Sequence, residues 1–477
     1  MFTPPVYFNL LSLLFSQISS SCRSTRYFHP STAKFSMPPE STDEFDGPIF
    51  EFPVEPLGLP ADASFGFFQG GPGDVLGPSN CYLLQAKLGY GIGSSVWLAK
   101  DNEQGRHVAL KILSGYATQL NQEHKLRELD ILQQLAAAPD DTGYCTKLLD
   151  HFYHRGIEED GGHLCLALRL EQASLTAVWD RSMGLPVAIV KRLIRHILRG
   201  LSRLHAGGIV HTDLKPENIM IATSTELTPQ ALDDWVAEHP ARVYPPMQSL
   251  TKVIIKAFIS EKLPFPSIEN LAQCDFAVGD LSHSQIVDNQ TTDDIVPLTL
   301  RPPEVMLGGA WTPSVDIWTL GALASSSSSI SCSLSTHFEN VINIVDFHVH
   351  DWPTTLLTSI RDHHRRFIRE GVSSIDTDEQ AIEVIFWQIA AFTGQRYPPA
   401  VLALYPLSEK FFEPNGTLRS LTYNSHPLEL CMRDAGFVGS ESDVAGACTL
   451  IKRCLQLNPM ARPAALSLLE DDSWLQS

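Results

Sequence analysis

The sequence lacks the features that would place it among membrane, metal-binding or nucleic-acid-binding proteins. Its 477 residues contain no apolar run of about 18 residues, the length that a membrane-spanning helix needs. The nine cysteines are scattered, without a Cys-x-x-Cys pair or metal-ligand spacing, which is typical of a reducing compartment. Basic residues are outnumbered, 35 against 54 acidic ones, for a formal net charge of -19. We therefore expect no transmembrane segment and no direct nucleic-acid binding, whereas basic partners are favoured.

Acidic residues are also missing from the first 39 positions. This serine-containing stretch with a few basic residues loosely resembles a mitochondrial presequence. Met37 offers a second start, in which case the leader is an artefact, and both alternatives stay open. Residues 38–80 are rich in Pro, Gly, Phe and acids without a sustained period, and they are predicted to be a linker. Residues 1–80 are thus expected to form a partly disordered N-terminal extension.

Regular structure is predicted to begin near Cys81, where a strand runs into a glycine loop, GYGIGSS, at positions 89–95. Glycines let backbone N–H groups approach phosphates without side-chain hindrance, although a plain hairpin turn would use them too. The sequence VALKI at 108–112 favours the phosphate-binding interpretation, because such a strand supplies a lysine, here Lys111, to nucleotide phosphates. The following helix carries Glu128, which is placed to hold Lys111 by an ion pair.

A second buried strand, residues 163–168, is expected to end at a hinge around residues 169–172, where backbone groups would meet the edge of an adenine. Leu88, Val96, Ala109 and Met220 are predicted as the apolar walls of that pocket. The complete predicted nucleotide-binding set is Leu88, Gly89, Gly91, Gly93, Ser94, Val96, Ala109, Lys111 and Met220.

The sequence HTDLKPEN at positions 211–218 is the most informative run in the chain. It follows an amphipathic helix and matches the H-R-D-L-x-x-x-N catalytic loop of phosphoryl transfer with one change, Thr212 for arginine. Asp213 is spaced to orient a substrate hydroxyl, Lys215 to neutralise the transferring phosphate, and Asn218 to hold a magnesium ion. With Lys111 and Glu128, these residues are the predicted catalytic set.

The second magnesium ligand has two candidates. Asp275 is followed by Phe-Ala and superficially imitates a D-F-G motif, whereas Asp280 ends the alternating strand 276–279. A magnesium-binding aspartate belongs at the end of such a strand, so Asp280 is predicted as the ligand together with Asn218. Farther on, Glu304 in RPPE is predicted to pair with Arg462, and the helix that begins near Asp316 is predicted to support the catalytic loop.

In this order the motifs of residues 81–477 resemble the eukaryotic protein kinases. Three details resemble the SR-protein kinases, particularly fungal members: Thr212, Ser94 in place of the third loop glycine, and an insert at about 223–275. The resemblance implies an α+β bilobal fold, with a β-rich N-lobe (81–172) and a mainly helical C-lobe (173–477). It also implies a monomer in cytoplasm and nucleus that uses ATP and Mg²⁺ to phosphorylate serines in Arg-Ser-rich splicing factors.

Three departures bear on this interpretation. Ser282 replaces the family glycine after the magnesium aspartate, and Pro297 stands where the family often has a threonine that contacts the catalytic Asp and Lys. The third is the atypical serine-rich stretch 322–345, including Ser325–Ser329, where the family has an apolar helix. An active serine/threonine kinase is the first hypothesis, because all the reacting residues are present. A non-catalytic pseudokinase or scaffold, or the product of a misread gene, is the alternative.

Thr212 also predicts how activity is controlled. An arginine at this position gathers a phosphorylated residue of the activation segment by bidentate hydrogen bonds. Threonine has neither the charge nor the reach to do so. We therefore expect activity without phosphorylation of the candidate acceptors Ser284, Thr291 and Thr292.

Overall fold

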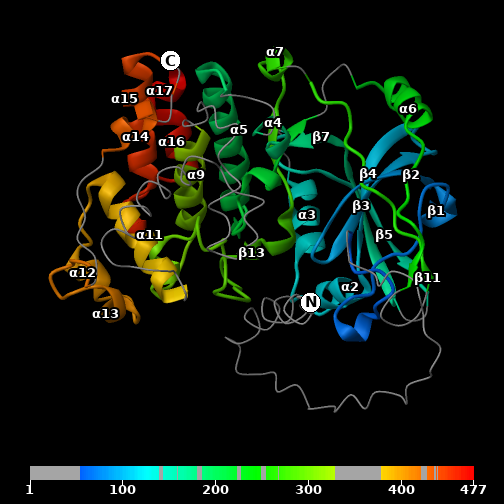
Figure 1. The fold of residues 1–477 in the computed structure, drawn as a ribbon, viewed down its shortest axis with the longest axis horizontal. Helices are drawn as coiled ribbons and strands as arrows, with labels where there is room; N and C mark the ends of the chain where they lie inside the picture. Colours follow the sequence, from blue (N-terminus) through cyan, green and yellow to red (C-terminus); the bar gives the residue numbers. More distant parts are fainter. Residues whose placement is uncertain are drawn as a thin grey trace, which may run out of the picture.

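The computed structural model has a β-rich half and a helical half, which is the predicted bilobal α+β fold (Figure 1). It describes residues 54–138, 143–157, 160–179, 185–222, 227–248, 254–266, 268–327, 378–419, 427–434, 437 and 439–477. The leader (1–39) and most of the serine-rich stretch (322–345) lie outside these residues. Among the described helices, none has both the length and the apolar character needed to cross a membrane.

The N-lobe is a six-stranded antiparallel sheet with strand order β1-β2-β3-β4-β6-β5. Alternating apolar residues form these strands, whose inward faces are almost fully buried. Their bounds are β1 Val75–Leu76, β2 Tyr82–Gly91, β3 Ser94–Asp101, β4 Arg106–Leu113, β5 Leu148–Arg155 and β6 Gly162–Arg169. Two helices lie against the sheet, α2 (Gly115–Gln122) and α3 (Glu128–Ala137).

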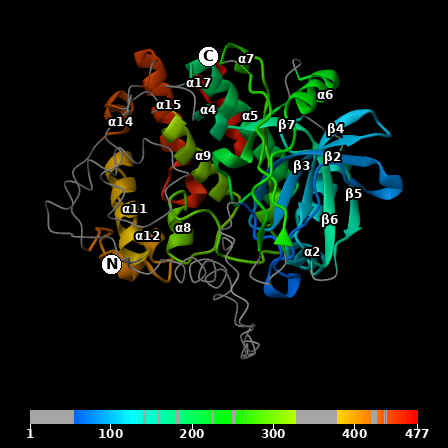
Figure 2. The same cartoon turned by 45° about the vertical axis from the view of Figure 1, so that its right-hand side comes forward.

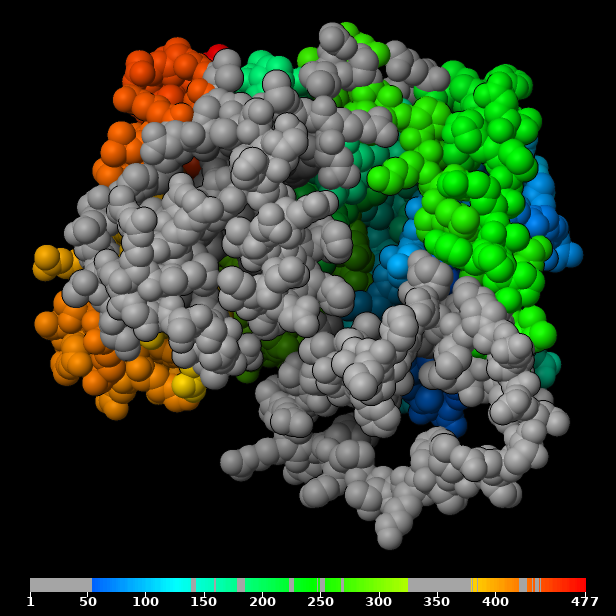
Figure 3. Space-filling view, viewed as in Figure 1, coloured from blue at the N-terminus to red at the C-terminus, as the bar shows by residue number. Residues whose placement is uncertain are grey.

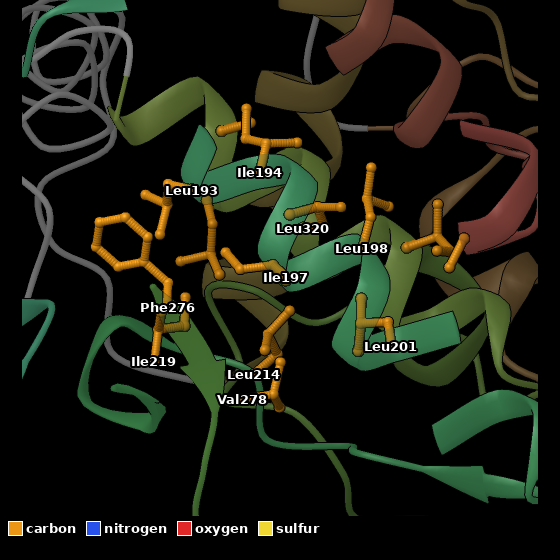
Figure 4. Packing of buried hydrophobic residues seen from close by; sticks show 14 of the residues in the cluster. Leu193, Ile194, Ile197, Leu198, Leu201, Leu214, Ile219, Phe276, Val278 and Leu320 are labelled. Carbon is orange, nitrogen blue, oxygen red and sulfur yellow. The ribbon is translucent and has the colours of Figure 1, made fainter. Parts of the chain in front are cut away.

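The C-lobe is built around α5 (Val187–Ala206), whose apolar stripe is buried as its spacing of three and four predicted. In Figure 4, Ile194, Ile197 and Leu201 of α5 lie in one cluster with Leu214 of the catalytic loop and Leu320 of α9. Outside the insert at 223–275, the α-helices that the structure describes in this lobe are α4 Thr176–Trp179, α5, α8 Pro303–Met306, α9 Ser314–Ser327, α11 Asp378–Thr393, α12 Pro399–Leu402, α13 Ser408–Phe411, α14 Leu428–Asp434, α15 Glu441–Cys454, α16 Ala465–Asp471 and α17 Ser473–Gln476.

Short strands at the junction of the lobes position the catalytic segments. They form two antiparallel sheets, of order β12-β9-β7 and β13-β8. Their bounds are β7 Glu171–Ser174, β8 Ile209–Val210, β9 Ile219–Ala222, β12 Phe276–Val278 and β13 Gln285–Ile286. The catalytic loop therefore runs from the end of β8 to the start of β9, and β12 leads directly to Asp280.

The prediction of a linker for residues 38–80 is wrong for residues 54–80. This segment packs on the sheet, and Phe67 and Phe68 are only 1% and 7% exposed. Phe68 contacts Trp97 of β3 edge to face, with ring centroids 6.2 Å apart. The segment buries irregularly spaced aromatic residues through tertiary contacts, so it has no period for sequence inspection to detect.

The insert at 223–275 folds back onto the N-lobe. It contains α6 (Pro229–Glu238), β10 (Met247–Gln248), β11 (Ile254–Ile255) and α7 (Ile268–Leu271). Trp235 of α6 packs with Leu98 of the sheet, and Phe258 contacts Trp97. In the turned view of Figure 2 the green α6 lies beside the blue strands, and Figure 3 shows green residues of the insert over the blue N-lobe surface.

Helix α9 extends into the serine-rich stretch. It continues to Ser327, and Ala322, Leu323 and Ala324 are each less than 9% exposed. The helix that supports the catalytic loop is therefore formed over its described length, although serines follow its apolar part. Residues 328–377 lie outside the described part of the chain.

Candidate active site

Three charged side chains from separate elements meet at the junction of the lobes. Lys111 on β4 donates to Glu128 at the start of α3 over 2.7 Å and to Asp280 after β12 over 2.8 Å. The predicted Lys111–Glu128 ion pair is thus present, and both residues are less than 9% exposed. The structure places Asp280, not Asp275, at this lysine, since Asp275 pairs with Arg192 over 2.8 Å at a half-exposed position.

The charges of Lys111 and Asp280 support each other, whereas burial and the neighbouring Asp280 raise the pKa of Glu128. Burial disfavours a charged lysine, but Asp280 and Glu128 more than offset it, so the pKa of Lys111 lies above its ordinary value. Burial likewise opposes ionisation of Asp280, yet the neighbouring Lys111 holds the pKa of that carboxyl well below its usual range. A permanently charged lysine beside an ionised aspartate suits a site that receives polyphosphate and a cation.

The catalytic loop brings its three predicted residues together. Lys215 Nζ lies 2.9 Å from Asp213 Oδ2, and Asn218 Nδ2 donates to the backbone oxygen and to Oδ2 of Asp213 over 2.8 and 3.0 Å. Burial lowers the pKa of Lys215, but the carboxylates of Asp213, Glu217 and Asp280 together outweigh it, and the net shift is upward. Asp213 therefore has a fixed orientation, as a residue that positions a hydroxyl requires.

Asp316 of α9 holds the backbone of the catalytic loop by hydrogen bonds, as predicted for this helix. Its carboxylate accepts hydrogen bonds from the backbone N–H groups of His211 and Thr212 over 2.8 and 3.0 Å, and from His205 Nε2 over 2.9 Å. Burial would raise the pKa of Asp316, but the hydrogen bond with His205 and the nearby His211 lower it. Thr212 has a positive φ of 63°, so these bonds also stabilise an unusual backbone conformation.

The glycine loop leaves room for a ligand. A Cβ built on Gly89 would meet nothing within 4 Å, and one on Gly91 only Ser94 Oγ at 4.0 Å. Neither glycine has a positive φ, so neither backbone strain nor internal packing requires glycine there. Gly93 differs, because its Cβ would lie 3.1 Å from Ala117. The open space at Gly89 and Gly91 fits the close approach of phosphate groups to backbone N–H groups.

The four residues predicted as apolar walls of the adenine pocket have partly exposed side chains, although most of the sheet around them is buried. Leu88, Val96, Ala109 and Met220 are each partly exposed. Val96 and Ala109 lie on the same face of the sheet as Lys111, because Val96 pairs with Lys111 and Ala109 stands two positions before it on β4. This face carries the contacts of Lys111 with Glu128 and Asp280. Sequence inspection missed one further wall residue, Leu168 of β6. It pairs with Ala109 of β4 and is also partly exposed. Its position at the end of the predicted strand 163–168 was the signal that could have identified it.

The metal candidates can supply oxygen ligands, as hard cations require. Asp280 offers an ionised carboxylate with a 40% exposed side chain. Asn218 uses its amide N–H groups on Asp213, which leaves Oδ1 as its oxygen donor. These two residues therefore fit a magnesium ion bound together with phosphate oxygens.

Two further features noted in the sequence lie around the site, the Glu304–Arg462 pair and the replaced family threonine. The Glu304–Arg462 pair is confirmed as a fully buried bidentate ion pair, with N–O distances of 2.6 and 2.7 Å. Pro297, which stands at the position of the family threonine, has no side-chain group that could bond Asp213 or Lys215. Lys215 instead bonds Asp213 directly.

Comparison with known proteins agrees with this geometry. The protein kinase domain family matches residues 82–235. The chain is 30% identical over 256 residues to the serine/threonine-protein kinase SRPK of Physarum polycephalum, covering 51% of this chain and 59% of that protein. It is 36% identical over 146 residues to the protein kinase dsk1 of Schizosaccharomyces pombe, covering 29% of this chain and 26% of that one. It is 37% identical over 149 residues to the serine/threonine-protein kinase SKY1 of Saccharomyces cerevisiae, covering 29% of this chain and 20% of that protein. The chain thus spans from about a fifth to three fifths of these relatives.

Proposed function

Because the chain carries a protein kinase domain similar to those of the SR-protein kinases, we propose that it transfers the γ-phosphate of ATP to serines of Arg-Ser-rich proteins. The observation that carries the proposal is the cluster of Lys111, Glu128 and Asp280, beside the ordered loop of Asp213 and Asn218. The polar side chains expected for phosphoryl transfer lie on four separate segments and meet at one place.

Each residue has a role that follows from its position. Lys111, oriented by Glu128, binds the α- and β-phosphates under the glycine loop. Asp280 and Asn218 would hold Mg²⁺, and the ion would supply positive charge to the phosphate oxygens. Asp213 orients the substrate hydroxyl and takes its proton as the bond to the γ-phosphorus forms and the bond from that phosphorus to the β-phosphate oxygen breaks, so that ADP leaves. Lys215 stabilises the negative charge on the transferred group.

The substrate class rests on charge and on the relatives. The net charge of -19 favours arginine-rich peptides, which an acidic surface attracts at low salt. Two of the relatives are named serine/threonine-protein kinases, and one of them is named SRPK. We extend the proposal to a monomer acting in cytoplasm and nucleus, on the same resemblance.

The proposal is tested by exchanging Asp213 for Asn. Turnover of an Arg-Ser repeat peptide should fall by orders of magnitude while ATP affinity survives, because only the interaction made in the transition state is lost. Asp275→Asn is the matched control, since this aspartate lies at the surface against Arg192. Equal turnover in Asp213→Asn and the wild type would reject the catalytic assignment.

A second experiment separates the substrate class from the activity. The wild type should phosphorylate an Arg-Ser repeat peptide better than an acidic or a proline-directed peptide, and added salt should raise the KM for the Arg-Ser peptide. Preference for either other peptide would reject the SR-type substrate and leave the kinase proposal intact. Absence of transfer to all three, with ATP still bound, would favour the pseudokinase alternative.

A further inference from the structure

The connection between the two lobes at the predicted adenine edge is very short. Strand β6 of the N-lobe sheet ends at Arg169, and β7 of the sheet at the junction begins at Glu171, so that Leu170 alone stands between them. On the N-lobe side Arg169 is still paired with Val108 of β4. On the C-lobe side Glu171 is already paired with Ala222 of β9. The chain therefore passes from the sheet of one lobe into the sheet of the other across a single residue.

The two ends of this connection are joined by an ion pair. Arg169 donates through Nε to Glu171 Oε1 over 2.8 Å, and its Nη2 lies 2.7 Å from the same oxygen. The arginine side chain is 31% exposed and that of the glutamate only 5%. Glu171 Oε2 is buried and has no hydrogen-bond partner in the part of the chain that the structure describes. Burial raises the pKa of the Glu171 carboxyl, and Arg169 only partly offsets this rise. Arg169 is therefore the cation that favours the charged form of this carboxylate and fixes its position.

Arg169 also contacts a segment that lies beside the catalytic strands. Its Nη2 donates to the backbone oxygen of Gly143 over 3.0 Å. The next residue, Tyr144, accepts through its backbone oxygen from the N–H of Val278 over 2.9 Å. Val278 is the last residue of β12, which leads to Asp280. One guanidinium thus connects both ends of the hinge to the segment that pairs with the strand of the predicted magnesium ligand.

The ion pair lies on the side of the hinge away from the predicted adenine walls. Successive residues of an extended chain point to opposite sides, so Leu170 points away from Arg169 and Glu171. Leu170 is 5% exposed and belongs to a buried cluster, against which the predicted wall residues Leu88 and Ala109 pack. The two charged side chains therefore do not face the base, and an effect on the nucleotide has to pass through the hinge backbone.

We propose that Arg169 is a positioning residue for nucleotide binding, which holds the hinge backbone through Glu171 in the geometry that an adenine edge needs. The inference rests on the proposed function and deepens it, because it names a residue of the same site outside the predicted catalytic and nucleotide-binding sets. A backbone that is already fixed does not have to be ordered when the ligand binds. Without the ion pair the one-residue connection can change its peptide orientations, so affinity for the base falls while Lys111 and Asp280 keep their places.

Arg169→Met tests this, because methionine is unbranched like the arginine stem but forms no ion pair. The Kd for adenosine, which carries the base without phosphates, should rise about fivefold, and the KM for ATP should rise by a similar factor with kcat unchanged. Arg169→Lys should fall between this variant and the wild type, since one nitrogen can keep the ion pair. Arg106→Met is the matched control, because Arg106 pairs with Asp101 over 3.1 Å with similar exposures, 41% and 4%, at the end of β3 away from the glycine loop. The control should leave adenosine binding unchanged.

A double variant separates positioning from the cost of an unpaired buried charge. Arg169→Met combined with Glu171→Leu leaves no buried carboxylate without a counter-ion, so it should be more stable to denaturant than Arg169→Met. The Kd of the double variant for adenosine should nevertheless stay raised. Wild-type affinity for adenosine in Arg169→Met or in the double variant, or an equal loss in Arg106→Met, would overturn the proposal. A wild type that binds no adenosine would contradict the proposed function itself, and the inference would fall with it.

Discussion

Two buried lysines in the N-lobe sheet, Lys111 and Lys87, each pair with a glutamate, but their surroundings differ. Lys111 on β4 contacts Glu128 and also Asp280, and its pKa lies above the ordinary value. Lys87 on β2 contacts Glu55 of the N-terminal segment, with both side chains 1% exposed, and burial lowers its pKa. The second carboxylate is the difference, since it overcomes the burial penalty at Lys111, whereas Glu55 only partly offsets that penalty at Lys87.

The two pairs therefore suit different tasks. Lys111 stays charged and lies beside a partly exposed aspartate, where phosphate groups can reach it. Lys87 is enclosed between Tyr90 and Trp97, with its Nζ 5.3 and 5.9 Å from the ring centroids, and its backbone oxygen accepts from the N–H of Glu261 in the insert. The Lys87 pair thus joins the sheet to the N-terminal segment and to the insert, two segments outside the predicted catalytic motifs, and we assign it to stability. A lysine–glutamate pair alone does not identify a phosphate site.

The largest expected effect is on turnover in Lys111→Met. Loss of the charge that binds the phosphates should reduce kcat/KM for ATP by about three orders of magnitude or more, in the range of lost transition-state contacts. The fold should persist with lower stability, because methionine fills a similar volume but leaves Glu128 buried without its counter-ion. Steady-state kinetics with an Arg-Ser peptide measure the first effect and circular dichroism the second. A variant within tenfold of wild-type kcat/KM would contradict the role of Lys111.

Glu55→Gln should have its effect on stability instead. Removing one charge leaves Lys87 buried without a counter-ion, which costs about 3 kcal/mol, at the low end of such losses because the glutamine oxygen can still accept a hydrogen bond. Denaturant unfolding measures this loss. The double variant Glu55→Leu with Lys87→Met removes both charges and should recover most of it. No loss in Glu55→Gln would mean that the N-terminal segment is not anchored by this pair.

Raising the pH should change the contributions of the two pairs to the free energy of unfolding in opposite directions. Both lysines have an ordinary pKa of 10.5. The folded protein holds the Lys111 proton more tightly than the unfolded chain, so the stability from this pair is present below pH 10.5 and lost as the pH rises through the folded pKa. For Lys87 the unfolded chain holds the proton more tightly, so its burial penalty disappears as the pH approaches 10.5. Unfolding of wild type, Lys111→Met and Lys87→Met between about pH 8 and pH 11 compares these trends, and parallel trends would contradict the assignment.

The smallest expected effect concerns the ion pairs that attach helix α6 to the sheet. Asp233 lies 2.8 Å from Lys100 and 3.2 Å from His107 Nε2, but about a third of its side chain is exposed. Asp233→Asn should therefore lower the free energy of unfolding by only about 0.2–1 kcal/mol, and less at high salt. A loss as large as that of Glu55→Gln would mean that α6 depends on this contact rather than on the apolar contacts of Trp235.

Sequence inspection predicted the partners of Lys111 but not the partner of Lys87. Lys111, Glu128, Asp213 and Asp280 could be predicted as site residues because phosphoryl transfer fixes residue types at set distances from strands and loops. The partner of Lys87 could not, because Glu55 is 32 residues away in a segment without hydrophobic period. For the same reason residues 54–80 were predicted to be a linker.

Side-chain contacts without a motif were also beyond sequence inspection. Gln285 lies in a segment that was correctly placed by its flanking aspartate and RPPE sequence, yet an amide that bonds the backbone six and seven residues away has no pattern of its own. The buried pair of Glu304 and Arg462, separated by 158 positions, was predictable only because the family places charged residues there. Chemistry shared with a family is therefore visible in the sequence, and contacts particular to this chain require the structure.

The most direct test of the account is phosphate transfer per folded molecule, measured side by side for Lys87→Met and Lys111→Met with ATP and an Arg-Ser peptide. The folded fraction is determined for each variant by denaturant titration in the assay buffer. We predict that the molecules of Lys87→Met that remain folded transfer phosphate at close to the wild-type rate, whereas the folded molecules of Lys111→Met transfer almost none. Equal rates per folded molecule in the two variants would contradict the distinction between a catalytic and a structural lysine pair.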